Sequence, residues 1–273
     1  MSATNRILAG SPGDCCFAAF KHEGTPVGSK ISIADIPTYF VEPRKSNDNG
    51  CRQYPEAERV LIFFADIWGP FYQSNMLLQD FFAQNGFTVP GIDYFLGDWV
   101  YMHEDGSGFN RVKWGQGKVK TANEVLPKWW EAVKVRFGDL LFVGLSSLSG
   151  YCFGAPYTME LSADPVVAAA AVAHPTYLNE DRFWKMSKPL MLSCAETDHT
   201  FPLPNRRIAQ DILIECKIQY YFQIFSGVNY GFASRGDLSI PDACWAREQS
   251  VQGIKMWFHR FLDERSRVTK EKL

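Results

Sequence analysis

The chain has 273 residues, 46% of them hydrophobic and 21% charged, and its formal net charge is −2. This composition is typical of a globular protein with its own apolar core, and we expect one domain over residues 1–273. The small charge excludes a general polyanion-binding surface, no segment approaches the roughly 20 apolar residues of a membrane span, and the cysteines lack zinc-type pairing. We therefore expect no nucleic-acid partner, no membrane, no metal, and a reduced cytoplasmic setting.

Short apolar runs alternate with helical patterns along most of the chain. The run "RVLIFFADIW" at 59–68 is almost continuously apolar, as in a strand buried on both faces. Helical spacing follows at 75–86 and ends at Gly86, a residue typical of a helix C-cap. A later helix is expected at 122–138, with Pro127 in its first turn. Further strands are expected at 87–95, 139–147, 165–175, 188–196 and 218–227, and further helices at 205–216 and 241–265.

This alternation predicts an α/β fold, with a mostly parallel sheet and helices on both faces. Two polar stretches, at 42–58 and 104–120, are expected to be surface excursions rather than domain boundaries. In such a sheet, functional residues gather at the carboxyl ends of the strands. Three candidates follow predicted strands there: Cys152, Asp198 and the loop around Tyr230.

The segment "GYCFG" around Cys152 matches a nucleophile elbow with sulfur in place of the usual hydroxyl. Glycine at positions 150 and 154 would leave room for a sharp strand-to-helix turn. The amides of the following helix would favour the thiolate, and the amide of Phe153 would bind an oxyanion. The competing interpretation is a buried structural cysteine in a glycine-rich joint.

Asp198 lies in "CAETDHTFP", just after a predicted buried strand. This is where an α/β-hydrolase fold carries the acidic member of its triad, and the chain order of nucleophile and acid is kept. The alternative is a loop aspartate that makes a turn with its own backbone.

Five blocks in order resemble the dienelactone hydrolase family, above all its eukaryotic and largely fungal branch: "GDCCFAAFKHEGTPVG", "GYCFGA", "AHPTYL", "AETDHTFP" and "FSGVNYGFASRGDLS". The resemblance covers nearly the whole chain. It implies an α/β-hydrolase fold and no metal or organic cofactor. It also implies a Cys-Asp-His triad that hydrolyses small-molecule esters or lactones. We expect a monomer or a homodimer.

The last block departs from the family because Tyr230 stands where members usually carry the histidine base. A phenol with a pKa of about 10 donates a hydrogen bond near neutral pH but does not readily accept the thiol proton. Three compensations stay open. Cys152 is acidic enough to react without a base, Tyr230 acts as a general acid or as a phenolate, or another histidine takes part. His199 follows Asp198 directly, whereas His174 lies at a strand end where a structural histidine is the more common outcome.

A second departure precedes the elbow, where the chain has about three residues more than the family's usual run. Such residues form a bulge, shift the strand register, or reflect an error in the gene model. By resemblance, the Ile67 amide completes the oxyanion site and Asp66 is an acidic residue near the resting thiol. Arg235 either contacts an anionic substrate or pairs with Asp237.

Two functions follow from these residues. The leading hypothesis is a hydrolase-like enzyme that acts on an ester, lactone or related carbonyl of a small molecule, or that has been diverted to non-hydrolytic chemistry. The alternative is an inactive family member that binds a small molecule or a protein.

Overall fold

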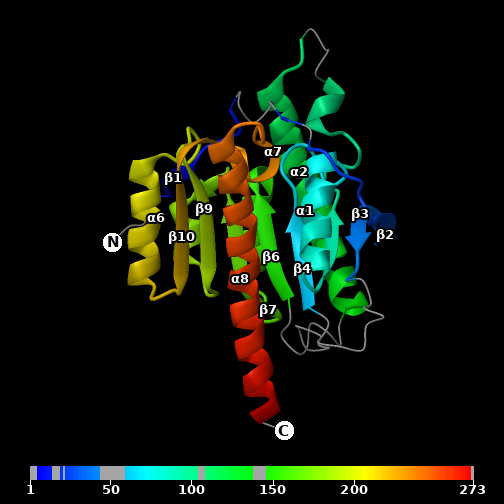
Figure 1. Ribbon diagram of the computed structural model, residues 1–273, viewed down its shortest axis with the longest axis vertical. Helices are drawn as coiled ribbons and strands as arrows, with labels where there is room; N and C mark the ends of the chain where they lie inside the picture. The colour runs from blue at the N-terminus through cyan, green and yellow to red at the C-terminus, as the bar shows by residue number, and fades with distance from the viewer. Residues whose placement is uncertain are drawn as a thin grey trace.

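An eight-stranded sheet forms the centre of the computed structural model, which describes residues 5–13, 19–20, 22–43, 59–103, 108–137 and 146–271 (Figure 1). The strand order is β10-β9-β7-β6-β4-β5-β3-β2. These strands are β2 (Ser29–Ile33), β3 (Ile36–Val41), β4 (Arg59–Phe64), β5 (Phe87–Ile92), β6 (Ser146–Tyr151), β7 (Val167–Ala173), β9 (Leu190–Thr197) and β10 (Tyr220–Asn229). A separate antiparallel pair joins β1 (Ile7–Ala9) to β8 (Leu178–Asn179).

Six neighbouring strands, from β10 to β5, run parallel, as the alternating pattern predicted. The exception is the β2–β3 hairpin, which adds to β5 in the antiparallel direction. Its two-residue turn, Ala34-Asp35, has φ values of 49° and 62°. Both central residues of a type I′ turn need positive φ, and glycine or asparagine usually marks such turns. The sequence analysis missed this hairpin because neither residue is present there.

Helices cover both faces of the sheet. In Figure 1, α1 (Gln73–Gln84) and α8 (Pro241–Glu271) lie in front of it. The opposite face packs against α2 (Arg111–Arg136), α4 (Ala155–Leu161), α5 (Glu180–Trp184) and α6 (Leu203–Glu215). Short turns η2 (Val100–His103), η3 (Cys152–Gly154) and α7 (Phe232–Arg235) complete the described elements. No helix in these ranges combines the length and apolarity needed to cross a membrane.

Side chains of strand β4 pack into the apolar clusters on both faces of the sheet, as its continuous apolar run predicted. Phe63 packs in the cluster that includes Phe258 of α8, whereas Phe64 packs in the cluster that includes Trp129 of α2. Successive side chains of a strand point to opposite faces, so a strand covered on both sides must be apolar throughout. All six residues of β4 are buried, and the exit of this strand is therefore held rigidly.

Helix α2 corrects two expectations. It begins at Arg111, inside the stretch predicted to be a surface excursion, and Pro127 lies well within it rather than in its first turn. The Asn110 side chain caps the start by accepting a hydrogen bond from the Lys113 amide at 2.9 Å. Gly115 and Gly117 weaken the local helical signal, and buried packing by residues such as Trp129 overrides it.

Strand β6 also differs from expectation. A strand was predicted at 139–147, but β6 runs from Ser146 to Tyr151, and residues 138–145 lie outside the described ranges. Its pairing with β7 is irregular between Ser146 and Ser147, within the segment where the extra residues were noted. The side chains of Ser147 and Ser149 are buried, so polar side chains occupy a central strand.

Candidate active site

Five candidate side chains follow five neighbouring parallel strands, all at the carboxyl edge of the sheet. From β4 to β10 in sheet order, they are Asp66, Cys152, His174, Asp198 and Tyr230. This is the edge at which ligand sites of open α/β sheets form. The predicted nucleophile, acid and base-position residues therefore come together in space, and His174 lies between the first two.

Cys152 occupies a sharp turn between β6 and α4. Its φ of 52° lies in the left-handed region, which non-glycine residues adopt at a cost. A Cβ on Gly150 would lie 2.2 Å from Thr158 Oγ1, and one on Gly154 would lie 2.3 Å from the Phe64 carbonyl oxygen. The steric reason given for the two glycines is therefore confirmed. Cys152 has no exposed surface, and its role as nucleophile stays a prediction.

Asp198 makes a turn with its own backbone, and its role as the acidic member of the site stays a prediction. Its Oδ1 accepts hydrogen bonds from the Thr200 amide at 2.9 Å, the Thr200 hydroxyl at 2.7 Å and the Phe201 amide at 2.9 Å. One oxygen thus makes a local turn. The other, Oδ2, is buried and has no hydrogen-bond partner among the described residues. A carboxylate held in this way keeps one oxygen for a further donor.

Tyr230 is held beside the predicted acid and is 6% exposed. Its amide donates to the Thr197 carbonyl at 2.9 Å, next to Asp198. The ring has His174 on one side, with centroids 5.0 Å apart, and His199 on another, at 5.2 Å. It belongs to the same buried cluster as Cys152. The side chain that replaces the usual base is therefore packed into the site.

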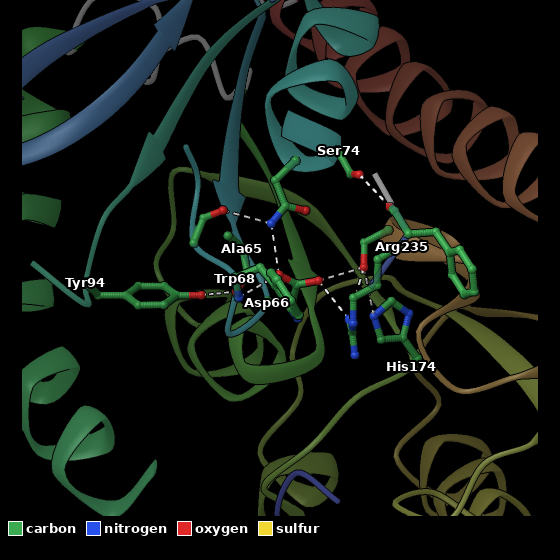
Figure 2. Close-up of polar contacts among 11 residues, drawn as sticks. Ala65, Asp66, Trp68, Ser74, Tyr94, His174 and Arg235 are labelled. Carbon is green, nitrogen blue, oxygen red and sulfur yellow. Dashed lines mark hydrogen bonds and ion pairs between the residues drawn. The ribbon is translucent and has the colours of Figure 1, made fainter. Parts of the chain in front are cut away.

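Asp66 and Arg235 form a buried ion pair, with Oδ2 and Nη1 2.8 Å apart (Figure 2). The Ser234 hydroxyl donates to the same oxygen at 2.7 Å. Asp66 Oδ1 accepts from the Trp68 amide at 3.0 Å and from Asn75 Nδ2 at 2.9 Å. Each oxygen of this carboxylate therefore accepts two hydrogen bonds. Asp237, the ion-pair partner considered for Arg235, accepts hydrogen bonds from Ser239.

The two amides predicted to bind an oxyanion belong to Phe153 and Ile67, which are fully buried in the cluster that holds Cys152. The Tyr94 hydroxyl donates to the Ala65 carbonyl, two residues before Ile67 (Figure 2). Burial, and after it the neighbouring Tyr157, Asp66 and Cys152, raise the pKa of Tyr94 well above its usual value. This phenol is therefore a neutral donor that anchors the segment.

The sequence analysis missed the roles of Tyr94 and Ser234 and treated His174 as structural. Tyr94 is the second-last residue of the predicted strand at 87–95, so its position near the carboxyl edge was an available signal. Ser234 carried no signal of its own, because its contact with Asp66 spans 168 positions. Among the described residues, no group of three histidine, cysteine or acidic side chains is placed to hold a metal ion.

The sheet order, the elbow at Cys152 and the acidic residue after β9 define an α/β-hydrolase fold. The family model "Dienelactone hydrolase family" matches residues 50–262, so the chain belongs to this family and is a hydrolase-like enzyme.

Similar proteins agree with this assignment. "Dienlactone hydrolase 1" of Gibberella moniliformis is 31% identical over 268 residues, covering 96% of this chain and 99% of that protein. "Hydrolase pyvD" of Aspergillus violaceofuscus is 30% identical, covering 92% of this chain and 97% of that protein. A crystal structure of a putative dienelactone hydrolase from Klebsiella pneumoniae has a TM-score of 0.68 at 13% identity, covering 86% of this chain and 99% of its own.

Proposed function

We propose that the protein cleaves an ester, lactone or related carbonyl bond of a small molecule, with Cys152 as the nucleophile. Asp198 is the acidic member of the site, and Tyr230 occupies the position of the usual base. The left-handed backbone of Cys152 carries this proposal, because it is a strained conformation at a strand-to-helix turn. The close approach around Gly150 and Gly154 maintains that strain.

In the proposed reaction, the Cys152 thiolate attacks the carbonyl carbon and forms a tetrahedral oxyanion. The amides of Phe153 and Ile67 bind this oxyanion. The C–O bond then breaks, and the leaving oxygen takes up a proton in place of the one that the thiol gave up. Water hydrolyses the resulting thioester and restores the thiol.

Asp66 and Arg235 belong to the proposed substrate-binding region. Arg235 Nη1 already donates to Asp66 at 2.8 Å, so an anionic substrate group would contact another nitrogen of the guanidinium. We expect Arg235→Met to raise the KM of an ester that carries a carboxylate more than that of its neutral methyl-ester analogue. Equal KM changes for the two esters would remove Arg235 from substrate binding.

The second candidate function is an inactive member that binds a small molecule or a protein. The complete burial of Cys152, together with Tyr230 in the base position, favours it. In that case the residues at the carboxyl edge of the sheet would serve recognition, and Cys152 would be a structural residue of the elbow.

Hydrolysis of a small activated ester distinguishes the two functions. It is measured for the unaltered protein, Cys152→Ala and Tyr230→His. Turnover that Cys152→Ala abolishes supports the nucleophile. An inactive scaffold is supported if the unaltered protein shows no turnover, Tyr230→His gains it, and Tyr230→His/Cys152→Ala loses it again. No turnover in any of these proteins contradicts the proposal for this class of ester.

A further inference from the structure

Asp66, Ser234 and His174 form a chain of polar contacts at the carboxyl edge of the sheet. The Ser234 hydroxyl lies 2.7 Å from Asp66 Oδ2 and 3.5 Å from His174 Nε2. Arg235 Nη1 lies 3.3 Å from the same hydroxyl oxygen. Asp66 follows β4, His174 follows β7, and Ser234 belongs to α7. Figure 2 shows His174 and Arg235 beside Asp66.

The hydrogen count of the Ser234 hydroxyl determines which imidazole nitrogen carries the proton. A hydroxyl has one proton to donate and two lone pairs. The Asp66 carboxylate only accepts, so it receives the hydroxyl proton, and the Arg235 guanidinium only donates. The remaining contact therefore has His174 Nε2–H as the donor and the Ser234 oxygen as the acceptor. A neutral imidazole protonated at Nε2 has its free lone pair on Nδ1.

The Nδ1 atom of His174 is buried and has no hydrogen-bond partner among the described residues, and His174 itself has 0% exposed surface. A buried acceptor without a donor is costly, and such groups in native structures often have a functional role. Burial, and after it the Arg235 guanidinium, hold the pKa of His174 well below its usual value. The imidazole is therefore neutral near pH 7, with its lone pair available.

Cys152 and His174 directly follow the last paired residues of two neighbouring strands. Tyr151 and Ala173 are paired in the β6–β7 register, so Cys152 and His174 are the next residues on two strands about 4.8 Å apart. Both leave their strands with a left-handed backbone, with φ values of 52° and 36°. The Thr176 amide donates to the Cys152 carbonyl at 3.2 Å and ties the two turns together.

From this geometry, we propose that His174 is the general base for Cys152 and performs through Nδ1 the task for which Tyr230 is unsuited. The inference rests on the proposed function. The thiol proton moves from Sγ to Nδ1, and the thiolate attacks the carbonyl carbon. The imidazolium returns the proton to the leaving oxygen. In the second half, His174 takes a proton from the attacking water and returns it to Sγ. Asp66, acting through Ser234, is a positioning residue that sets the tautomer.

Several ionisable groups surround this imidazole and tune its basicity. Burial is the main influence, and the Arg235 charge adds to it by disfavouring the imidazolium. The groups that face His174 are Tyr151 and Tyr230 by ring contact, Arg235 by its charge, and Asp66 through the Ser234 hydroxyl. We expect the acid limb of the kcat/KM profile to lie below pH 6.5, the ordinary value for histidine.

The first test observes the tautomer and does not depend on any substrate. The chain has five histidines, so a protein labelled with ¹⁵N-histidine gives few signals, and His174→Gln identifies those of His174. The expected spectrum at pH 7 has a protonated Nε2 and an unprotonated Nδ1. Ser234→Ala should turn this into a mixture of tautomers. A protonated Nδ1 in the unaltered protein would overturn the inference.

The second test measures the alkylation rate of Cys152 by iodoacetamide from pH 5 to 8, with Cys216 as the internal reference. His174→Gln should slow Cys152 alkylation at pH 7 and lower kcat about 100-fold. His199→Gln is the matched control, because His199 also packs against Tyr230 but is exposed. Its Cys152 alkylation rate and its kcat should both stay within about twofold of the values for the unaltered protein.

The outcomes separate the two proposals. If Cys152 of the unaltered protein reacts no faster than Cys216, the nucleophile and thus the proposed function fail. If Cys152 is reactive but its rate is the same in His174→Gln, only the base assignment fails. If His199→Gln has the larger effect, the base is His199.

Discussion

Asp66 and Arg235 face each other at 2.8 Å, with side chains that are 1% and 2% exposed, so the site contains an ion pair fully shielded from solvent. Burying two charges is costly, and the pair is sustained by its hydrogen bonds. Asp66 accepts from Ser234 as well as from Arg235, so the pair organises α7 and the segment after β4 together.

Removal of one partner should therefore leave a buried, uncompensated charge. We expect Arg235→Met to lower the free energy of unfolding by about 3–5 kcal/mol. The double variant Arg235→Met/Asp66→Asn should lose less than the sum of the two single changes. Urea unfolding measures all of these values. The exposed Arg207→Met is the control, with a change of about 0.5 kcal/mol or less. Strict additivity would contradict the coupling.

The elbow glycines give a second prediction. A Cβ at residue 154 would lie 2.3 Å from the Phe64 carbonyl oxygen, and backbone cannot move aside cheaply. Gly154→Ala should therefore lower the free energy of unfolding by about 1–3 kcal/mol. Gly117→Ala is the matched control, because nothing lies within 4 Å of its Cβ position in α2, and it should stabilise by about 0.5–1 kcal/mol. Thermal unfolding measures the stability of both variants. Equal losses of stability in the two would contradict the steric explanation.

Tyr94 gives a third prediction through its hydroxyl bond to the Ala65 carbonyl. Tyr94→Phe leaves this buried acceptor without its donor and should cost about 1–3 kcal/mol of stability. The segment that carries the proposed Ile67 oxyanion amide also loses its anchor, so we expect a lower kcat with little change in KM. Tyr220→Phe, which changes an exposed hydroxyl beside Gln210, is the control. An unchanged kcat in Tyr94→Phe would show that the anchor does not serve catalysis.

Acid sensitivity gives a fourth prediction. Burial, and after it Arg247, lower the pKa of His22 to about 4, and burial and then Arg59 do the same for His259. Between pH 6.5 and 4 the unfolded chain binds these protons and the folded protein does not, so the free energy of unfolding falls as the pH falls. Each histidine contributes up to about 1.4 kcal/mol per pH unit in that window.

Urea midpoints measured at pH 5, 6, 7 and 8 check this expectation. Stability should fall from pH 6 to 5 and show no contribution from these groups between pH 7 and 8, where both are neutral in either state. His22→Gln and His259→Gln should each reduce the slope below pH 6.5. A slope that neither variant changes would contradict the assignment.

Much of the fold could be predicted because its signals are local. The continuous apolar run of β4 and the helical spacing before Gly86 each reflect burial of a single element. The elements that the sequence analysis missed or misplaced lacked such local signals. The β2–β3 turn uses Ala34 and Asp35 in place of glycine or asparagine, and buried tryptophans stabilise α2 despite its glycines and Pro127. There, packing outweighed local propensity.

The elbow at Cys152 could be recognised from local sequence, because two glycines at fixed spacing meet a steric demand that arises within a few residues. The pairing of Arg235 with Asp66, across 169 positions, and the contact of His174 with Ser234, across 60, became visible only in the folded chain. Sheet order places distant strand ends side by side, and that order depends on the packing of the whole chain. The partners of a buried charge or imidazole therefore follow from topology, which no local pattern specifies.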